Sequence, residues 1–433
     1  MFKLLNDFST SSPDVKCNYY HIYEHRLSHF QHRLLKSSSV WTVREKSPKI
    51  IHRVLDVINS PCIAIGTLYK NPPNRPNVLA QFELDANIAE DSVSTTLTPD
   101  QHRQTFFSLE DSSGSVSLKF EDPSIGDGLV SGVCLAVLGE ESPDGEFFIV
   151  KDIRFPAPVP GSFPPPLPVS GSSKYIAFVS GLGLQDPDSD TALCHAFADF
   201  VSGLISNYFD ISRIVVAGGL FQSKDNSSGH SAHLESVKGA KGVSVSDWLT
   251  KLAKSCQGRS KVDVIPGIFD PSPCSLPQPP FFKGLLPDIE GVFRCRNPYS
   301  LEYAPTSDQS YSVIGSSGQI IADMCRYSSL SPLDALKLCL DCGHIAPTAP
   351  DTLDMVPSSS DPLVLERIPR VLFSSGDSFA SSNTKIETKT DEGTCQGDVS
   401  LFIVPHFQTS RSFVLLDLSS FETREVCIES LNY

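Results

Sequence analysis

The sequence predicts a mixed α+β fold in two domains: a small β-barrel, then a larger domain of two packed mixed sheets flanked by helices. Three observations support this prediction. Short strands and turns fill residues 61–155, a proline-rich stretch follows at 155–168, and strands alternate with helices from Lys174 before a strand-rich end. The expected parts are an N-terminal segment at 1–49, a barrel at 50–155, a linker at 156–173 and a second domain at 174–433.

Charge limits the classes of function. The chain has 433 residues, enough for more than one core, and its formal net charge is −15. Tight binding of a phosphate backbone depends on concentrated Lys and Arg, so the isolated chain is not expected to hold DNA strongly. Partner proteins fit this composition better than nucleic acid does.

The 12 cysteines are scattered along the chain. No signal peptide or long apolar span is found at the amino end, which indicates a reducing compartment. Cys339 and Cys342, with His344 and Cys325 nearby, could form part of a zinc site. No second cysteine pair accompanies them and the surrounding pattern is helical, so core packing is favoured over zinc.

The amino end is expected to be frayed over residues 1–16. From Tyr19 onward apolar residues recur at helical spacing, which predicts an amphipathic helix whose apolar stripe packs on another element. His21, His25 and His29 lie four residues apart on another face. That spacing can ligate a metal, but no acidic or cysteine residue accompanies it, so a solvated face is favoured.

Residues 61–155 combine short apolar runs with turns, from Cys62–Tyr69 to Phe147–Phe155. This spacing is typical of a small, partly closed barrel of the oligonucleotide-binding type. Binding of DNA by such a barrel needs basic and aromatic residues facing outward, but acidic residues crowd the region. They are Glu110, Asp111, Glu121, Asp122 and Asp127. We expect a barrel that binds protein or buttresses its neighbour.

Lys174–Leu184 is an apolar strand that runs into a glycine turn, the place where ligands sit in open α/β sheets. A dinucleotide-binding loop is set aside because Asp186 stands where its third glycine belongs. Asp186, Asp188 and Asp190 suggest a calcium loop, but the glycine and the closing glutamate of that loop are missing. A solvated turn before the next helix is favoured.

The rest of the chain alternates between strands and helices. Helices are predicted at 191–209, at 243–253 and as a pair around 320–340. Strands are predicted at 211–217, 262–265, 371–373, 401–404 and 413–418. Two polar stretches rich in Ser and Gly, 222–242 and 374–397, are predicted to be long mobile loops.

The strand ends invite comparison with a two-metal phosphoesterase, in which carboxylate, histidine and amide groups bridge two divalent ions. Residues that cannot ligate, or ligate poorly, occupy most of the expected places: Gly181, Gly183, Gly218, Gly219, Ile268, Phe269 and Gln319. Only Asp270 and His344 remain as plausible ligands. Two groups cannot hold two metals, so no catalytic or metal-binding residue is assigned and no cofactor is expected.

Several stretches together resemble the family of small (second, or B) subunits of eukaryotic DNA polymerase delta, within the wider group of accessory subunits of B-family polymerases. The similar stretches follow one another from about residue 17 to the later part of the chain. They are Tyr19–Tyr23, Ala64–Tyr69, Phe178–Leu184, Ile265–Pro271, Thr306–Gln319, Asp323–Ser328 and His344–Leu353. The last stretch is the most specific. Gly218-Gly219 departs from the more frequent Gly-Asn, and an extended acidic tail is lacking.

The resemblance implies an oligonucleotide-binding domain joined to a calcineurin-like αββα phosphoesterase domain that has lost its metals. It also implies a nuclear, non-catalytic scaffold in replication and repair, with no membrane association and with DNA reached only through the complex. Its implied partners are the cysteine-rich C-terminal domain of the catalytic subunit and a third subunit, which reaches the sliding clamp.

Three alternatives stay open. The chain could retain a metal-dependent phosphodiesterase or nuclease activity, or it could be the equivalent subunit of polymerase alpha or epsilon. The barrel could also bind single-stranded DNA, with an affinity that falls steeply as salt increases. The acidic composition makes this last alternative the weakest.

Overall fold

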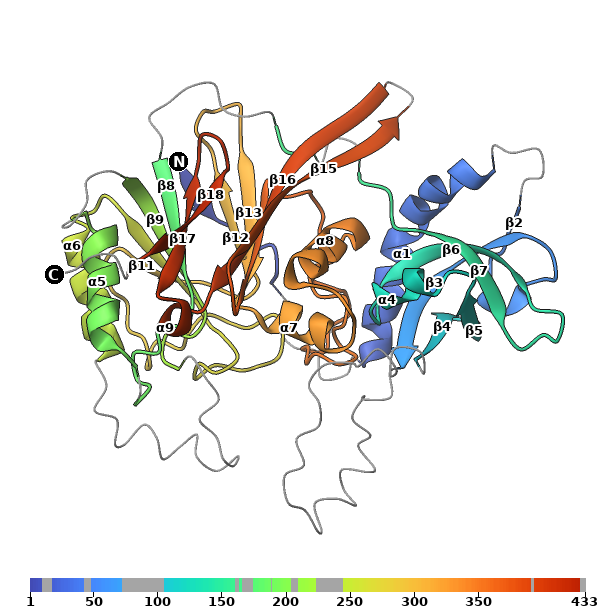
Figure 1. The fold of residues 1–433 in the computed structure, drawn as a ribbon, viewed down its shortest axis with the longest axis horizontal. Coiled ribbons are helices and arrows are strands. Elements are labelled where there is room, and N and C mark those ends of the chain that lie inside the picture. The colour runs from blue at the N-terminus through green and yellow to red at the C-terminus, as the bar shows by residue number, and fades with distance from the viewer. Residues whose placement is uncertain are drawn as a thin grey trace, which may run out of the picture. The chain divides into compact units, whose positions relative to one another are not determined.

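The computed structural model describes residues 1–9, 18–42, 48–71, 105–159, 163–165, 174–187, 189–203, 209–222, 244–390 and 393–428, without the side chains of 388–390 and 393–395. The chain divides into two compact units (Figure 1). The two-sheet unit comprises Met1–Ser9, Phe163–Gln319 and Ile368–Tyr433, and the barrel unit comprises Thr10–Ser162 and Ile320–Arg367. No helix in the described ranges is long and apolar enough to cross a membrane.

The two-sheet unit contains two mixed sheets, each of six strands in the described part of the chain. The first sheet consists of β11 (Val292–Arg294), β10 (Lys261–Ile265), β9 (Asp210–Ala217), β8 (Lys174–Val179), β17 (Ser412–Asp417) and β18 (Thr423–Cys427), in that spatial order. The second sheet consists of β1 (Phe2–Leu4), β12 (Tyr299–Tyr303), β13 (Tyr311–Ser316), β14 (Val371–Gly376), β16 (Gly393–Pro405) and β15 (Ala380–Thr390). Strands β8, β9, β10 and β11 are parallel, as are β13, β14 and β16.

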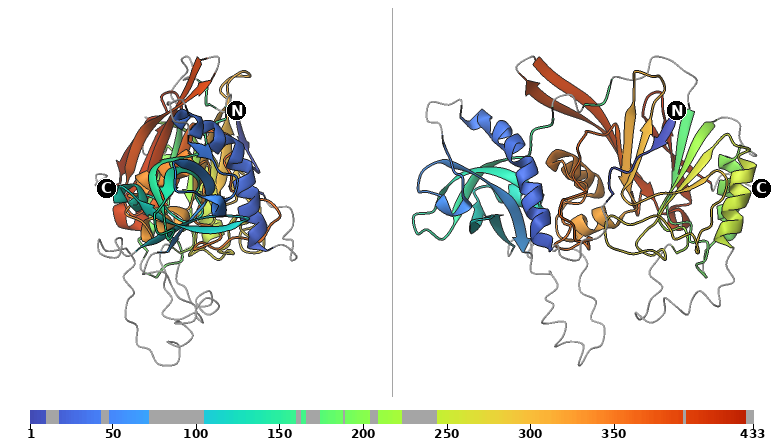
Figure 2. Two further views of the ribbon diagram at one scale, coloured as in Figure 1. Left: turned by 90° about the vertical axis from the view of Figure 1, so that its right-hand side faces the viewer. Right: turned by 180° about the vertical axis from the view of Figure 1, so that it is seen from behind.

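The core of this unit lies between the two sheets. Phe178 of β8 packs against Phe373 of β14 and Phe402 of β16, with ring centroids 4.7 and 5.1 Å apart. The other face of the first sheet is covered by α5 (Thr191–Val201) and α6 (Val245–Ser255), whose buried residues include Phe197 and Trp248 (Figures 1 and 2). Residues 176–179 of the apolar run are buried because both faces of their sheet are covered, and Tyr175 is partly buried.

The amino end is a strand, so the prediction of a frayed terminus over residues 1–16 was wrong for its described part. Strand β1 pairs antiparallel with β12, and Phe2 lies opposite Tyr303 with ring centroids 5.0 Å apart. The guanidinium of Arg213 also lies 5.4 Å from the centre of the Phe2 ring. Two apolar residues, Phe2 and Leu4, are a weak local signal, because a three-residue edge strand is stabilised mainly by the sheet it joins.

The described residues of 374–397 are strands and a bend, which overturns the prediction of this stretch as a mobile loop. Strand β14 continues to Gly376, and β15 pairs antiparallel with β16 from Ala380↔Ile403 to Thr390↔Gly393. Figures 1 and 2 show this hairpin extending past the neighbouring strands of its sheet. Strand β15 is polar and lies at the sheet edge, where charged and polar residues avoid further pairing, whereas β16 ends in the buried apolar run Leu401–Val404.

The barrel unit confirms the prediction of a barrel. Strands β3, β4, β5, β7 and β6 pair in sequence, and a β3–β6 pairing closes the ring. A short β2 adds parallel to β3. The bounds of these elements are β2 (Lys49–Ile50), β3 (Cys62–Asn71), β4 (Phe106–Asp111), β5 (Gly114–Phe120), α4 (Pro123–Asp127), β6 (Cys134–Glu141) and β7 (Phe148–Arg154).

Helix α1 (Tyr19–Ser38) confirms the prediction of an amphipathic helix, and it packs in the barrel unit. Its buried residues Phe30 and Leu34 lie in one cluster with Ile63 of β3 and Val364. Helices α7 (Gln319–Arg326) and α8 (Pro332–Cys342) were predicted as a pair around 320–340. Residues 320–367 group with the barrel unit rather than with the 174–433 part in which the sequence puts them, since they supply packing partners for α1.

The other predicted helices and strands of 191–418 are present, with ends shifted by a few residues. A short helix, α9 (Phe407–Ser410), follows β16. Part of the linker at 156–173, most of the predicted loop at 222–242 and part of the helix end near 204–209 lie outside the described residues.

Candidate functional site

The carboxyl ends of β8, β9, β10 and β13 form one edge of the two-sheet unit, and eight of the nine candidate positions follow them. Gly181 and Gly183 come after β8, Gly218 and Gly219 after β9, Ile268 to Asp270 after β10, and Gln319 after β13. The hydroxyl of Ser375, at the end of β14, donates to the carbonyl of Ala217 over 2.6 Å. Strand ends from both sheets therefore meet here. His344 belongs to the barrel unit.

Glycines close this edge by direct contact between backbones. The amide of Gly181 donates to the carbonyl of Gly218 over 3.0 Å, and that of Gly183 to Gly219 over 2.8 Å. Gly218 and Gly219 have φ angles of +81° and +67°. A Cβ on Gly218 would lie 2.6 Å from the Cβ of Ser317, and one on Gly219 would lie 2.7 Å from the Cα of Gly181. Both positions require glycine, because their backbone conformation and close contacts exclude a side chain.

Asp270 is buried and is held by backbone amides. Its Oδ2 accepts from the N–H groups of Gly219 and Gly267 over 2.9 and 2.8 Å, and its Oδ1 accepts from Phe221 over 2.8 Å. Burial raises the pKa of the Asp270 carboxyl, and these amide hydrogen bonds oppose that effect. The carboxylate joins the turns after β9 and β10, so its acceptor sites are used within the fold.

A cluster of uncharged side chains occupies the neighbouring part of the edge. Asn297 donates from Nδ2 to Gln278 over 2.5 Å and to Ser317 over 2.7 Å. Gln319 donates from Nε2 to the same Gln278 oxygen over 2.7 Å and accepts from the Ser317 hydroxyl over 2.7 Å. All four side chains are buried. They satisfy one another without a charge, as buried polar groups require.

The residues at this edge do not fit a pair of divalent ions. Such a pair needs several carboxylate or imidazole ligands, and among the eight candidate positions at this edge only Asp270 carries one, a carboxylate that already accepts three backbone amides. Ile268 and Phe269 have hydrocarbon side chains, so neither can ligate a metal. Ile268 is 43% exposed and Phe269 is partly exposed. No group of three or more His, Cys, Asp or Glu side chains with a geometry for metal binding occurs in the described ranges.

His406 is a polar residue of this edge that sequence reasoning missed. It follows β16, and its Nδ1 is buried without a hydrogen-bond partner in the described part of the chain. Burial lowers the pKa of the imidazole. The same rule that singled out the ends of the other strands could have found it, because Pro405 and His406 directly follow the run Leu401–Val404.

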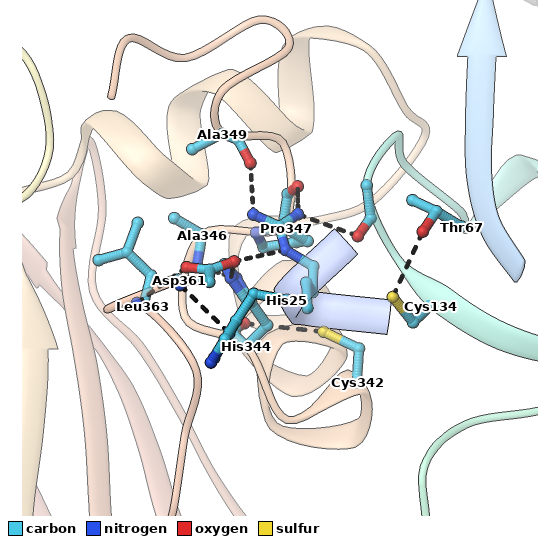
Figure 3. Close-up of polar contacts among 12 residues, drawn as sticks. His25, Thr67, Cys134, Cys342, His344, Ala346, Pro347, Ala349, Asp361 and Leu363 are labelled. Atoms are coloured by element: carbon cyan, nitrogen blue, oxygen red, sulfur yellow. Dashed lines mark hydrogen bonds and ion pairs between the residues drawn. The ribbon is translucent and has the colours of Figure 1, made fainter. Parts of the chain in front are cut away.

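His344 contributes instead to a buried ionic cluster in the barrel unit (Figure 3). Its Nε2 lies 2.8 Å from Oδ2 of Asp361, and its Nδ1 accepts from the amide of Ala346 over 3.1 Å. This pattern fits a neutral imidazole with its hydrogen on Nε2. Burial and the nearby charge of Arg26 lower the pKa of His344, which favours the neutral form.

Arg26, on α1, is the cation of the cluster. Its Nε donates to Asp361 over 2.6 Å, and its two terminal nitrogens donate to carbonyls of Gly132, Pro347 and Ala349 over 3.1, 2.8 and 2.6 Å. Neither charged side chain is exposed. Burial would raise the pKa of Asp361, but Arg26 and His344 outweigh it and hold the pKa below its ordinary range. One guanidinium thus links α1, the turn before β6 and residues 344–361.

The other candidate residues of the barrel unit have structural partners. The amide of Asp361 donates to Nδ1 of His25 over 3.2 Å. The thiol of Cys339 donates to the carbonyl of Ile345 over 3.2 Å. Burial raises the pKa of the Cys342 thiol to about 12, so this thiol is neutral at physiological pH. Sequence reasoning missed Arg26 because a polar residue on a helix gives no sign of a partner 335 residues away.

Comparisons with known proteins cover most of the chain. Residues 18–153 match a family described as DNA polymerase delta subunit OB-fold domain, and residues 176–382 match the family of the B subunit of DNA polymerase alpha/epsilon. A DNA polymerase delta small subunit of Oryza sativa is 30% identical over 427 residues, which cover 93% of this chain and 91% of the relative.

Two further relatives are similar over nearly their whole length. The DNA polymerase delta small subunit of Saccharomyces cerevisiae is 29% identical over 469 residues, covering 96% of this chain and 90% of the relative. The DNA polymerase delta subunit 2 of Drosophila melanogaster is 29% identical over 446 residues, covering 97% and 95%. The similarity extends over both compact units, so it is a property of the whole chain.

Proposed function

The chain belongs to the family of DNA polymerase delta small subunits, and from this premise we propose that it is a non-catalytic scaffold of the polymerase delta complex. The small subunits of this family are accessory subunits of the replicative polymerase. The observation that carries the proposal is the likeness over 93% of the chain, because a scaffold needs both units to present its surfaces. Two partners bound to one chain meet at a high effective concentration without any chemistry.

We propose in addition that the two-sheet unit is a calcineurin-like αββα sandwich that has lost its metals. Two facing mixed sheets, with α5 and α6 outside the first, support this relation. The glycine contacts and the neutral amide cluster at the strand ends support the loss of ligands. The positions proposed to be degenerate are Gly181, Gly183, Gly218, Gly219, Ile268, Phe269, Asp270, Gln319 and His344.

The proposed partners are the cysteine-rich C-terminal domain of the catalytic subunit and the third subunit of the complex, through which the chain would reach the sliding clamp. We propose that the chain acts in the nucleus, in replication and repair, because its relatives are subunits of a replicative polymerase. The net charge of −15 supports contact with DNA through the complex rather than through this chain alone.

Co-expression tests the scaffold directly. The chain would be expressed with the C-terminal domain of the delta, alpha or epsilon catalytic subunit and analysed by size-exclusion chromatography. We expect selective 1:1 recovery with the delta domain. A folded chain that retains none of the three domains would contradict the scaffold, and selective retention of the alpha or epsilon domain would contradict its place in the delta complex.

Hydrolysis tests the absence of catalysis. The chain would be incubated with bis-nitrophenyl phosphate and Mn²⁺, beside Asp270→Ala and the exposed-residue control Glu290→Gln. We expect no hydrolysis above background from any of the three proteins. Manganese-dependent turnover that the control keeps and Asp270→Ala loses, in a protein that is still folded by Trp248 fluorescence, would overturn the non-catalytic proposal.

A further inference from the structure

A groove with a volume of about 540 Å³ lies in the barrel unit, between α1 and the strands β3 and β4. Residues from both sides of it are close in space although they come from distant parts of the sequence. Glu24 and Leu35 belong to α1, and Glu110 belongs to β4. The groove does not involve the strand ends of the two-sheet unit, so it is a separate feature of the molecule.

Large apolar side chains in this groove are open to solvent. Tyr20 is 52% exposed, and Leu35 and Ile50 are each 36% exposed. Burial of apolar surface is favourable, at about 25 cal/mol per Å², so a partner that covers these residues gains binding free energy. Exposed apolar surface that is gathered in a groove, rather than scattered singly, is typical of an interaction site.

The charges of the groove have one sign. Glu24, Glu110, Asp111 and Asp351 line it, and no Lys or Arg is among its lining residues in the described ranges. Within the described part of the chain, the side chain of Glu110 accepts from the hydroxyls of Ser108 and Ser115, over 3.2 and 3.4 Å. Among the described residues, Glu24 pairs with Nδ1 of His21, at 3.9 Å. No Lys or Arg of the described chain forms an ion pair with Glu24 or Glu110.

We propose that this groove docks a basic amphipathic segment of another protein subunit of the polymerase complex. Apolar side chains of the segment cover Tyr20, Leu35 and Ile50, while its Lys or Arg side chains face Glu24 and Glu110. The inference rests on the proposed function, since a scaffold has protein partners. Nucleic acid is disfavoured because carboxylates repel phosphates. A second copy of this chain is disfavoured by its net charge of −15, which would bring like charges together.

The experiment uses the full chain with the delta catalytic subunit's C-terminal domain and, separately, the third subunit. The groove variant carries Glu24→Lys and Glu110→Lys. The control variant carries Glu121→Lys and Glu146→Lys, two exposed residues of the same unit that do not line the groove. Both variants change the net charge equally, so a difference in their partner binding depends on where the substituted residues lie and not on total charge.

We expect the groove variant to bind one of the two partners at least tenfold more weakly than the wild type, and the control variant to bind it within about threefold. Rising salt should weaken the wild type more than the groove variant, because the complementary charges are screened. A groove variant that binds both partners as the control does would overturn the docking site and leave the scaffold proposal intact. A wild type that binds neither partner would overturn both.

A photo-crosslinking amino acid at Leu35 identifies the occupant. Val40, which is 61% exposed and does not line the groove, is the matched control position. We expect adducts from position 35, but not from position 40, on a partner segment that contains Lys or Arg among apolar residues. Adducts between two copies of this chain, or on an acidic segment, would contradict the proposed occupant.

Discussion

Buried polar groups have different kinds of partner in two regions, the strand ends of the two-sheet unit and the ionic cluster of the barrel unit. At the strand ends, backbone amides hold Asp270, and four neutral side chains bond to one another. In the barrel unit, Arg26 and Asp361 are fully buried as a charged pair, with His344 beside them. Both regions satisfy their polar groups, but only the cluster depends on two opposite charges staying together.

The difference is between a strand edge whose polar groups are satisfied locally and a charged cluster that connects several elements. In the described ranges no cation pairs with Asp270, and the backbones of Gly218 and Gly219 lie in close contact with neighbouring residues. The ionic cluster links helix α1, the turn at Gly132 and the stretch 344–361, which are separate in sequence. A mutation at the cluster should therefore loosen several elements at once, whereas one at the strand ends should act locally.

Two tryptophans allow each unit to be followed alone. Trp41 lies in the barrel unit and Trp248 in the two-sheet unit, and the chain contains no other tryptophan. Trp248→Phe leaves a fluorescence reporter of the barrel unit, and Trp41→Phe leaves one of the two-sheet unit. Urea unfolding of these two backgrounds gives separate free energies, so that effects on the two regions can be compared.

The largest effect is expected from Asp361→Asn. It leaves the buried guanidinium of Arg26 without its anion, which costs about 3–5 kcal/mol. The Trp41 reporter should show the loss, while the Trp248 reporter changes little. Replacing both charges, with Arg26→Met and Asp361→Leu, should recover part of the stability. An Asp361→Asn protein as stable as the wild type would contradict the view that the Arg26–Asp361 pair holds these elements together.

A smaller effect is expected from Asp270→Asn. The amide nitrogen of asparagine would face a backbone N–H instead of accepting from it, which costs about 1–3 kcal/mol. The Trp248 reporter should show this loss, and Glu290→Gln, an exposed residue of the same unit, should stay within about 0.5 kcal/mol of wild type. A loss seen equally by the Trp41 reporter would contradict a local role for Asp270.

The smallest effect is a change in pH dependence. Folding lowers the pKa of His344, so below about pH 6.5 the unfolded chain takes up a proton that the folded chain does not. Stability should therefore fall as the pH is lowered from 7 to 5.5, and this residue should contribute to the fall. The fall seen by the Trp41 reporter should be shallower in His344→Gln than in the exposed control His52→Gln. Equal slopes would show that His344 does not contribute.

Much of the local structure could be predicted because its signals are short in range. The helix from Tyr19 follows from apolar residues at helical spacing, and the strands at 174–179 and 211–217 follow from short apolar runs. Of the hairpin of β15 and β16, only the apolar run 401–404 could be predicted in this way, because β15 and the first part of β16 are polar and their pairing decides their structure. Strand β1 was missed for the same reason, since its partner β12 begins almost 300 residues later.

The candidate site was predictable only in part. The sequence alone indicates which strand ends lack ligands, because residue types decide what can bind a metal. It could not indicate that His344 lies in the barrel unit rather than with Asp270. Nor could it indicate the groove, whose apolar residues resemble core residues until their exposure is known.

The sequence by itself determined the barrel, the amphipathic helix and the alternation of strands and helices. These features depend on residue type and on spacing over a few residues. Only the tertiary structure decided that residues 320–367 pack with the barrel, that Arg26 meets Asp361 and that acidic and apolar side chains share one groove. The physical reason is that such contacts join residues far apart in the chain, whose burial and charge depend on what folds against them.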